Sequence, residues 1–79
     1  MRETLEPSCW KILEAIILSS SEIDYKKLST ATGYQTQTVY NSISALVDTG
    51  LCNRPQRGRV VATEKGKICF AIWHSKHLD

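Results

Sequence analysis

The spacing of apolar positions predicts four helices and one β-hairpin along this chain of 79 residues. The first helix is expected over about residues 7–18, because Pro7 suits a first helical position and apolar side chains then recur with a helical period. The residues of this apolar stripe are Cys9, Ile12, Leu13, Ile16 and Ile17. Trp10 lies beside the stripe and gives the helix a second apolar surface.

Capping residues set the limits of the next two helices. Asp24 is expected to cap the second helix through its carboxylate, with Leu28 and Ala31 facing inward. Gly33 is expected to end that helix in the left-handed conformation. The third helix then buries a stripe made of Val39, Ile43, Leu46 and Val47. The turn between the second and third helices is about three residues long, and two helices joined at a steep angle by such a turn are typical of a helix-turn-helix.

Two strands and a last helix are expected after Gly50. Residues 51–54 and 59–62 are predicted strands, since Pro55 and Gly58 favour a tight turn between them. Thr63 is placed to cap a last helix over about residues 64–77. The predicted fold class is α+β, mainly α: a winged helix-turn-helix with a three-helix core, a two-stranded wing and a C-terminal helix, in a single domain over residues 1–79.

Positive charge is concentrated in the second part of the chain. Residues 1–50 carry four basic and six acidic groups, whereas residues 51–79 carry six basic and two acidic groups. Five of those six positive charges lie between Arg54 and Lys67. A local basic patch on a chain with a net charge of only +2 indicates an anionic partner. The alternative is a solvated turn.

Composition excludes several classes of protein. The 42% of apolar residues and 23% of charged residues are typical of a globular domain rather than of a disordered chain. No apolar stretch is long enough to cross a bilayer, and the N-terminus lacks the order of a signal peptide. We therefore expect a soluble, cytoplasmic protein without a membrane partner. No catalytic motif is present, and we expect no enzyme activity.

The cysteines and histidines do not form a recognisable ligand set. Cys9, Cys52 and Cys69 lack C-x-x-C spacing and are expected to be small buried residues, although their odd number leaves an inter-subunit disulfide open. His74 and His77 share one side of the last helix, yet together with Asp79 they make an incomplete metal site. We expect neither a metal nor a cofactor.

The segment from Gly33 to Leu51 resembles the helix-turn-helix segment of MarR- and ArsR-type transcriptional regulators. The family segment reads Gly-apolar-Ser-x-x-Thr-Val, followed by apolar positions and Gly-Leu. The matching residues are Gly33, Tyr34, Thr38, Val39, Ile43, Leu46, Gly50 and Leu51. Thr63 and Gly66 resemble the Thr-x-x-Gly that opens the last helix of MarR-like proteins. The resemblance covers about residues 9–73, and it departs from the family at Gln35, where an N-capping Ser is usual and Thr36 is the substitute.

The resemblance implies that the third helix reads double-stranded DNA. The residues at the family's base-contacting positions are Thr36, Gln37, Tyr40 and Asn41. Their chemistry agrees, because amides bond adenine edges and hydroxyls bond bases or phosphates. This helix carries no Lys or Arg, so the attraction to DNA is expected from its neighbours and from the wing. The predicted backbone-contacting residues are Lys26, Lys27, Ser44, Arg54, Arg57 and Arg59.

The resemblance also implies dimerisation through the terminal helices. Trp10, Phe70 and Trp73 are the predicted interface, because they are an excess of aromatic surface for so small a core. An intramolecular core is the alternative use of these rings. The predicted function is a homodimeric transcriptional regulator, a repressor that reads a pseudo-palindromic site with half-sites roughly 10 bp apart, or a multiple of that. A winged-helix protein–protein adaptor is the rival, because fold alone does not fix function.

Overall fold

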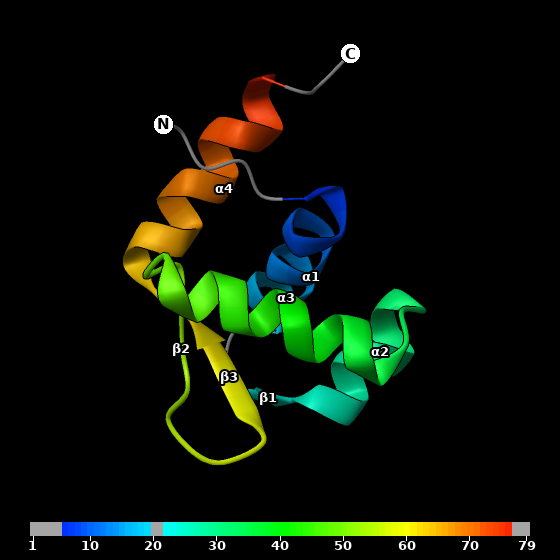
Figure 1. Cartoon of the computed structure of the whole chain (residues 1–79). Coiled ribbons are helices and arrows are strands. Elements are labelled where there is room, and N and C mark those ends of the chain that lie inside the picture. The colour runs from blue at the N-terminus through cyan, green and yellow to red at the C-terminus, as the bar shows by residue number, and fades with distance from the viewer. Residues whose placement is uncertain (1–5, 20–21, 77–79) are drawn as a thin grey trace.

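The computed structural model describes residues 6–19 and 22–76 and shows a mainly helical α+β fold (Figure 1). Its helices are α1 (Pro7–Leu18), α2 (Tyr25–Thr32), α3 (Thr36–Asp48) and α4 (Glu64–Lys76). Its strands are β1 (Ile23–Asp24), β2 (Cys52–Asn53) and β3 (Arg59–Ala62). The predicted fold class is confirmed. His77, the predicted end of the last helix, lies outside the described residues.

The strands form one small antiparallel sheet in the order β1-β3-β2. Ile23 pairs with Val60 on one side of β3, and Cys52 pairs with Ala62 on the other side. The predicted wing hairpin is confirmed, with β2 shorter than the expected strand over residues 51–54. Strand β1 was not predicted, because two residues are too few to show the alternation that marks a strand.

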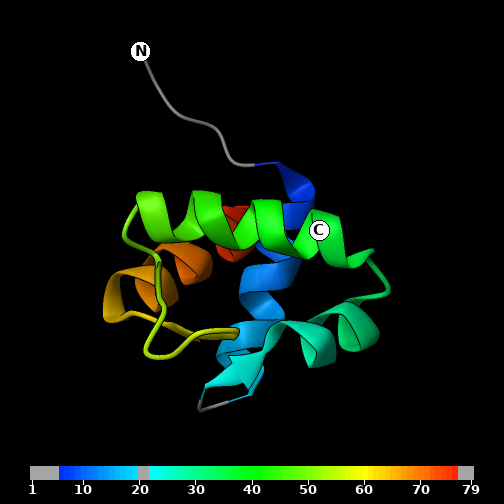
Figure 2. The ribbon, with the colours of Figure 1, turned by 60° about the horizontal axis from the view of Figure 1, so that its bottom comes forward.

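The core lies where α1, α2 and α3 meet β3. Helix α1 runs behind α3 in Figure 1, and α3 spans the molecule from side to side in both views (Figures 1 and 2). The side chains that are almost completely buried are Ile12, Leu13, Ile16, Leu28, Val39, Ile43, Leu46 and Val60. The predicted apolar stripes of the first and third helices therefore face the core. The expectation for Ala31 is wrong, because Ala31 is exposed and Tyr25 is the second residue of α2 that is buried.

Local capping chemistry fixes the ends of α2 and the start of α3. The Asp24 carboxylate accepts a hydrogen bond from the Lys27 N–H at 2.7 Å, and Gly33 ends α2 with a φ of 79°. Gln35 occupies the N-cap position of α3 without a side-chain cap bond. Thr36 is the first helical residue and does not replace the missing cap. Helix α3 thus begins with a weak N-terminus at the point where the sequence departs from its resemblance.

The Thr-x-x-Gly motif docks α4 onto the end of α3. The Thr63 hydroxyl accepts from the Gly66 N–H at 3.0 Å and donates to the Gly50 carbonyl at 2.7 Å. The Thr63 N–H donates to the Leu51 carbonyl at 3.0 Å. Gly66 is buried, and a Cβ atom on it would collide with the Leu51 carbonyl oxygen. The motif therefore combines an N-cap with a close approach of two backbones.

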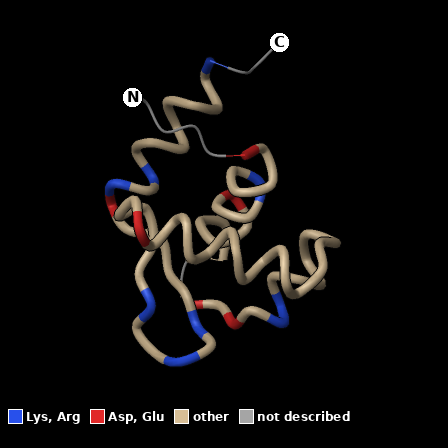
Figure 3. The backbone as a smooth tube through the Cα atoms, in the orientation of Figure 1, with Lys and Arg blue, Asp and Glu red and all other residues tan. Residues whose placement is uncertain are grey.

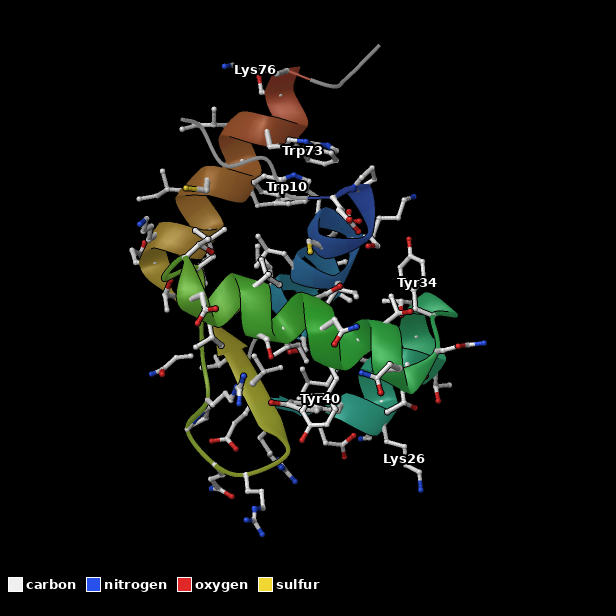
Figure 4. The ribbon with its side chains drawn as sticks, in the orientation of Figure 1. Trp10, Lys26, Tyr34, Tyr40, Trp73 and Lys76 are labelled. Carbon is white, nitrogen blue, oxygen red and sulfur yellow. The ribbon has the colours of Figure 1, made fainter. Side chains whose placement is uncertain are left out.

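An aromatic cluster joins α1 to α4. The rings of Trp10 and Trp73 are stacked, with centroids 5.0 Å apart and an interplanar angle of 8° (Figure 4). Phe70 packs against Trp73 with centroids 5.9 Å apart. These three predicted interface residues are thus in contact within one chain, which was the alternative use of their rings. On α4, Ile68 and Ile72 are left 54% exposed.

Candidate nucleic-acid interface

Helix α3 turns a polar face to solvent along its length. Thr36, Gln37, Tyr40 and Asn41 are all exposed, and Ser44 is half-buried. The structure therefore brings the four predicted base-reading residues together on one face, opposite the buried stripe of the same helix. We define the helix–wing surface as these five residues of α3 together with the wing arginines Arg54, Arg57 and Arg59.

Two amides on the α3 face are paired along the helix. The Gln37 amide nitrogen Nε2 donates to Asn41 Oδ1 at 3.2 Å, one turn further on. This bond orders two flexible side chains before any ligand arrives. An Asn or Gln amide carries a donor and an acceptor side by side, which is the pattern that matches the major-groove edge of adenine.

Tyr40 leans from α3 toward the start of α2. Its ring meets Tyr25 edge to face, with centroids 5.1 Å apart and an interplanar angle of 75° (Figure 4). Tyr40 is 50% exposed, whereas Tyr25 is 9% exposed. Burial raises the pKa of the Tyr25 hydroxyl, the charge of Arg54 opposes that rise, and the nearby Tyr40 adds to it. Tyr25 therefore stays protonated at neutral pH. Tyr25 is not among the residues singled out from the sequence.

The three wing arginines have different surroundings. Arg54 donates from Nη2 to the Ser44 hydroxyl at 3.2 Å, which links the wing to α3. Arg59 lies 3.7 Å from the Glu22 carboxylate, in an ion pair that is open to solvent. Arg57 is exposed in a turn that the Arg59 N–H closes by donating to the Gln56 carbonyl at 3.1 Å.

The turn at Arg57 depends on a glycine. Gly58 has a φ of 75°, which suits the third position of a type II turn.

Glu22 was missed as a partner of Arg59, since only the unpredicted β1–β3 pairing brings it beside the wing. An exposed ion pair of this length stabilises little, about 0–1 kcal/mol, so a phosphate can replace the carboxylate at small cost.

Positive charge flanks α3 instead of lying on it. Figure 3 shows basic residues along the wing and at the start of α2, on the same side of the molecule. Lys26 and Lys27 are the exposed residues at the start of α2. Helix α3 itself carries a single charge, that of Asp48 in its last turn. The positive charge nearest to the polar α3 face therefore lies on the neighbouring elements, the wing and the start of α2.

The described residues offer no metal centre and little accessible thiol. Among residues 6–19 and 22–76, no three His, Cys, Asp or Glu side chains form a group that could hold a metal ion. His77 and Asp79 lie outside this part of the chain. Cys9 and Cys52 are buried, and burial raises the pKa of the Cys52 thiol to about 12. Cys69 on α4 is half-buried. None of the described helices has the length and apolarity to span a bilayer.

These elements define a winged helix-turn-helix domain: α2, a short turn and α3, with a β2–β3 wing beside α3. No protein-family model matches the sequence, and no curated protein sequence matches it. Among solved structures, Sco5413, a MarR family transcriptional regulator from Streptomyces coelicolor, superposes with a TM-score of 0.74 and 25% identity over 82% of this chain and 49% of that chain. IdeR from T. acidophilum superposes with a TM-score of 0.72 and 21% identity over 98% of this chain and 36% of that chain.

The chain is therefore a winged-helix protein that resembles a regulator of the MarR type, as its sequence predicts. It spans about half the length of Sco5413 and a smaller part of IdeR. The likeness to IdeR concerns the fold alone.

Proposed function

We propose that this chain is a sequence-specific DNA-binding transcriptional regulator, a homodimeric repressor that places α3 in the major groove. One observation carries the proposal: the polar face of α3 is exposed and has basic groups of the wing and of α2 on the same side of the molecule. The likeness to Sco5413, a transcriptional regulator, supports it. The first turns of such a helix are the part that meets base edges.

Selection of bound sequences from a random duplex library tests the proposal directly. We expect an enriched inverted repeat with half-sites roughly 10 bp apart, because a two-fold dimer presents two copies of α3 to one face of DNA. Enrichment of a single half-site would contradict the dimer and leave the reading helix in place. No retention of DNA at low salt would contradict the proposal and favour the protein–protein adaptor.

The proposed roles of helix and wing are separable by variants. Asn41→Ala should cost on the order of 1–3 kcal/mol at one base pair of the selected site and little on random DNA. Ser75→Ala, an exposed polar change on α4, is the matched control. Equal losses on selected and random DNA would contradict base reading by Asn41.

Arg57→Ala should weaken binding to all sequences alike and reduce the salt slope by about 1, because it removes one phosphate contact. Lys76→Ala removes an exposed positive charge at the end of α4, far from the wing in Figure 4, and should leave the slope unchanged. If Arg57→Ala changed the preferred sequence instead, the wing would be reading bases.

For the dimer, we propose that α4 packs against a second copy through its exposed isoleucines. Ile68 and Ile72 are four residues apart, so they share one face of the helix. Trp10, Phe70 and Trp73, the interface predicted from the sequence, would then support this face from beneath through their ring contacts.

Sedimentation velocity tests whether the Ile68–Ile72 face of α4 forms the dimer interface. Ile68→Glu combined with Ile72→Glu should produce a folded monomer, since both side chains are already half exposed. Leu18→Glu is the matched control, because Leu18 is a still more exposed aliphatic residue, on α1. A dimer that persists in the double variant would exclude this face as the interface.

A further inference from the structure

Tyr25 contacts both the wing turn and the α3 part of the helix–wing surface. It is the first residue of α2 and is 9% exposed. Its N–H donates to the Gly58 carbonyl in the wing turn at 3.2 Å. Its ring receives Tyr40 of α3 at a centroid distance of 5.1 Å. The charge of Arg54, which is bonded to Ser44 of α3, opposes the rise that burial causes in the pKa of the Tyr25 hydroxyl.

The contacts of Tyr25 act on both sides of the proposed DNA site. Its backbone continues the β1–β3 pairing, in which Asp24 is opposite Arg59, and extends the hold on the wing to the turn itself. Its side chain sets the resting position of Tyr40, one of the four exposed residues of the α3 face. The wing turn with Arg57 and the α3 face are therefore both in contact with one buried residue, Tyr25.

We infer that Tyr25 is a positioning residue that holds the wing turn and Tyr40 in a fixed relation, so that helix and wing contact DNA as one rigid surface. The inference rests on the proposed function. A wing that is already held in place loses little conformational freedom on binding, whereas a loose wing must be ordered at that moment. Tyr25 itself need not touch DNA for this effect.

Hydrogen exchange on the free protein tests the hold without DNA. Tyr25→Leu keeps the backbone bond to the Gly58 carbonyl and removes the ring that fixes this backbone against Tyr40. The change should therefore speed exchange of the Arg59 amide, which closes the wing turn, by roughly two- to tenfold, which corresponds to the loss of an edge-to-face ring pair. Tyr34→Leu is the matched control: Tyr34 is half-buried at the α2–α3 turn and points away from the wing (Figure 4). Unchanged Arg59 exchange in Tyr25→Leu would overturn the inference.

A second variant guards against a general loss of structure. Tyr40→Leu removes the same ring pair from its half-exposed member, where less buried surface is lost than at Tyr25. It should speed Arg59 exchange in the same direction while the global unfolding free energy changes little. Faster exchange spread evenly over all amides, in place of a local effect at the wing, would contradict a positioning role.

The DNA readout is the affinity for the selected site in three proteins: wild type, Tyr25→Leu and Tyr34→Leu. Tyr25→Leu should weaken binding by roughly two- to tenfold, because the looser wing must be ordered when it meets phosphate, and Tyr34→Leu should bind like wild type. Arg57→Ala should lower the salt slope by about 1 in all three backgrounds, because the ordered wing still reaches phosphate. Wild-type affinity in Tyr25→Leu would overturn the inference. If the wild-type chain bound no DNA, the proposed function would fail, while the exchange measurements would still decide whether Tyr25 holds the wing.

Discussion

Gly66→Ala should destabilise the fold although it replaces the poorest common helix former with the best one. Gly66 lies inside α4, and it is not among the glycines with positive φ, so alanine meets no conformational barrier there. On propensity alone the change should stabilise α4 by about 0.5–1 kcal/mol. The opposing effect is steric, because the new Cβ would collide with the carbonyl oxygen of Leu51.

The steric effect should dominate, because both colliding partners are backbone atoms or attached directly to the backbone. No rotamer change relieves the contact, so α4 must move away from the end of α3 and strain the bonds that Thr63 makes to Gly50 and Leu51. Overpacking of this kind costs about 1–3 kcal/mol, and each weakened hydrogen bond adds about 0.5–1.5 kcal/mol. After the gain in propensity, we expect a net loss of about 1–5 kcal/mol, which lowers Tm by roughly 4–8 °C for each kcal/mol in a domain of this size.

Thermal unfolding followed by far-ultraviolet circular dichroism, together with urea unfolding, measures this loss. Lys67→Ala is the matched control, since Lys67 is the next residue of the same helix and is exposed. A Gly66→Ala protein with the wild-type Tm or a higher one would refute the close approach of α4 to Leu51.

Three further predictions concern caps and a buried thiol. Asp24→Ala should lower the free energy of unfolding by about 1 kcal/mol because it removes the cap of α2. Gln35→Ser should raise it by about 0.5–1 kcal/mol because it supplies the cap that α3 lacks. Urea unfolding measures both changes, and two changes in the same direction would contradict the capping argument. Cys52, with its pKa raised by burial from 9.0 to about 12, should resist thiol reagents at pH 8 in the folded protein, while the half-buried Cys69 reacts first, as mass spectrometry of labelled peptides can show. The folded protein holds the Cys52 proton more tightly than the unfolded chain, so the protonated thiol adds to the free energy of unfolding. This contribution is complete below pH 9.0 and is lost toward pH 12 at up to about 1.4 kcal/mol per pH unit. In Cys52→Ala the free energy of unfolding should fall less steeply at alkaline pH, and a pH profile identical to wild type would contradict the raised pKa.

Local chemistry was enough to predict most of the fold. Asp24 and Gly33 act on backbone groups within a few residues, and so does Thr63 where it caps α4 at Gly66, so these roles follow from the sequence around them. The bonds from Thr63 to Gly50 and Leu51 bridge distant parts of the chain and were not predicted. The exposed face of α3 was also predictable, because the helical spacing of its apolar residues leaves the polar residues on the opposite side. Strand β1 could not be predicted, because its partner Val60 is distant in the sequence and its two residues show no pattern.

The candidate site was predictable in its residues and not in its connections. The sequence placed Tyr40 and Arg54 on the surface, but it contained no sign that Tyr40 packs against a buried Tyr25. Tyr25 was missed because a single aromatic residue at a helix start has the same local pattern whether it is buried or exposed. The partners of Trp10 were ambiguous for a related reason: excess aromatic surface is the same in sequence whether its partner is the same chain or another one.

The stacking of Trp10 on Trp73 gives the protein a built-in optical probe. The chain has two tryptophans, and both belong to this one contact. Its indole emission and near-ultraviolet dichroism therefore report on a single junction, the one between α1 and α4. Since only Thr63 separates the end of β3 from the start of α4, this junction includes the helix that directly follows the wing. Separation of α4 from α1 can consequently be followed by fluorescence on the unlabelled protein.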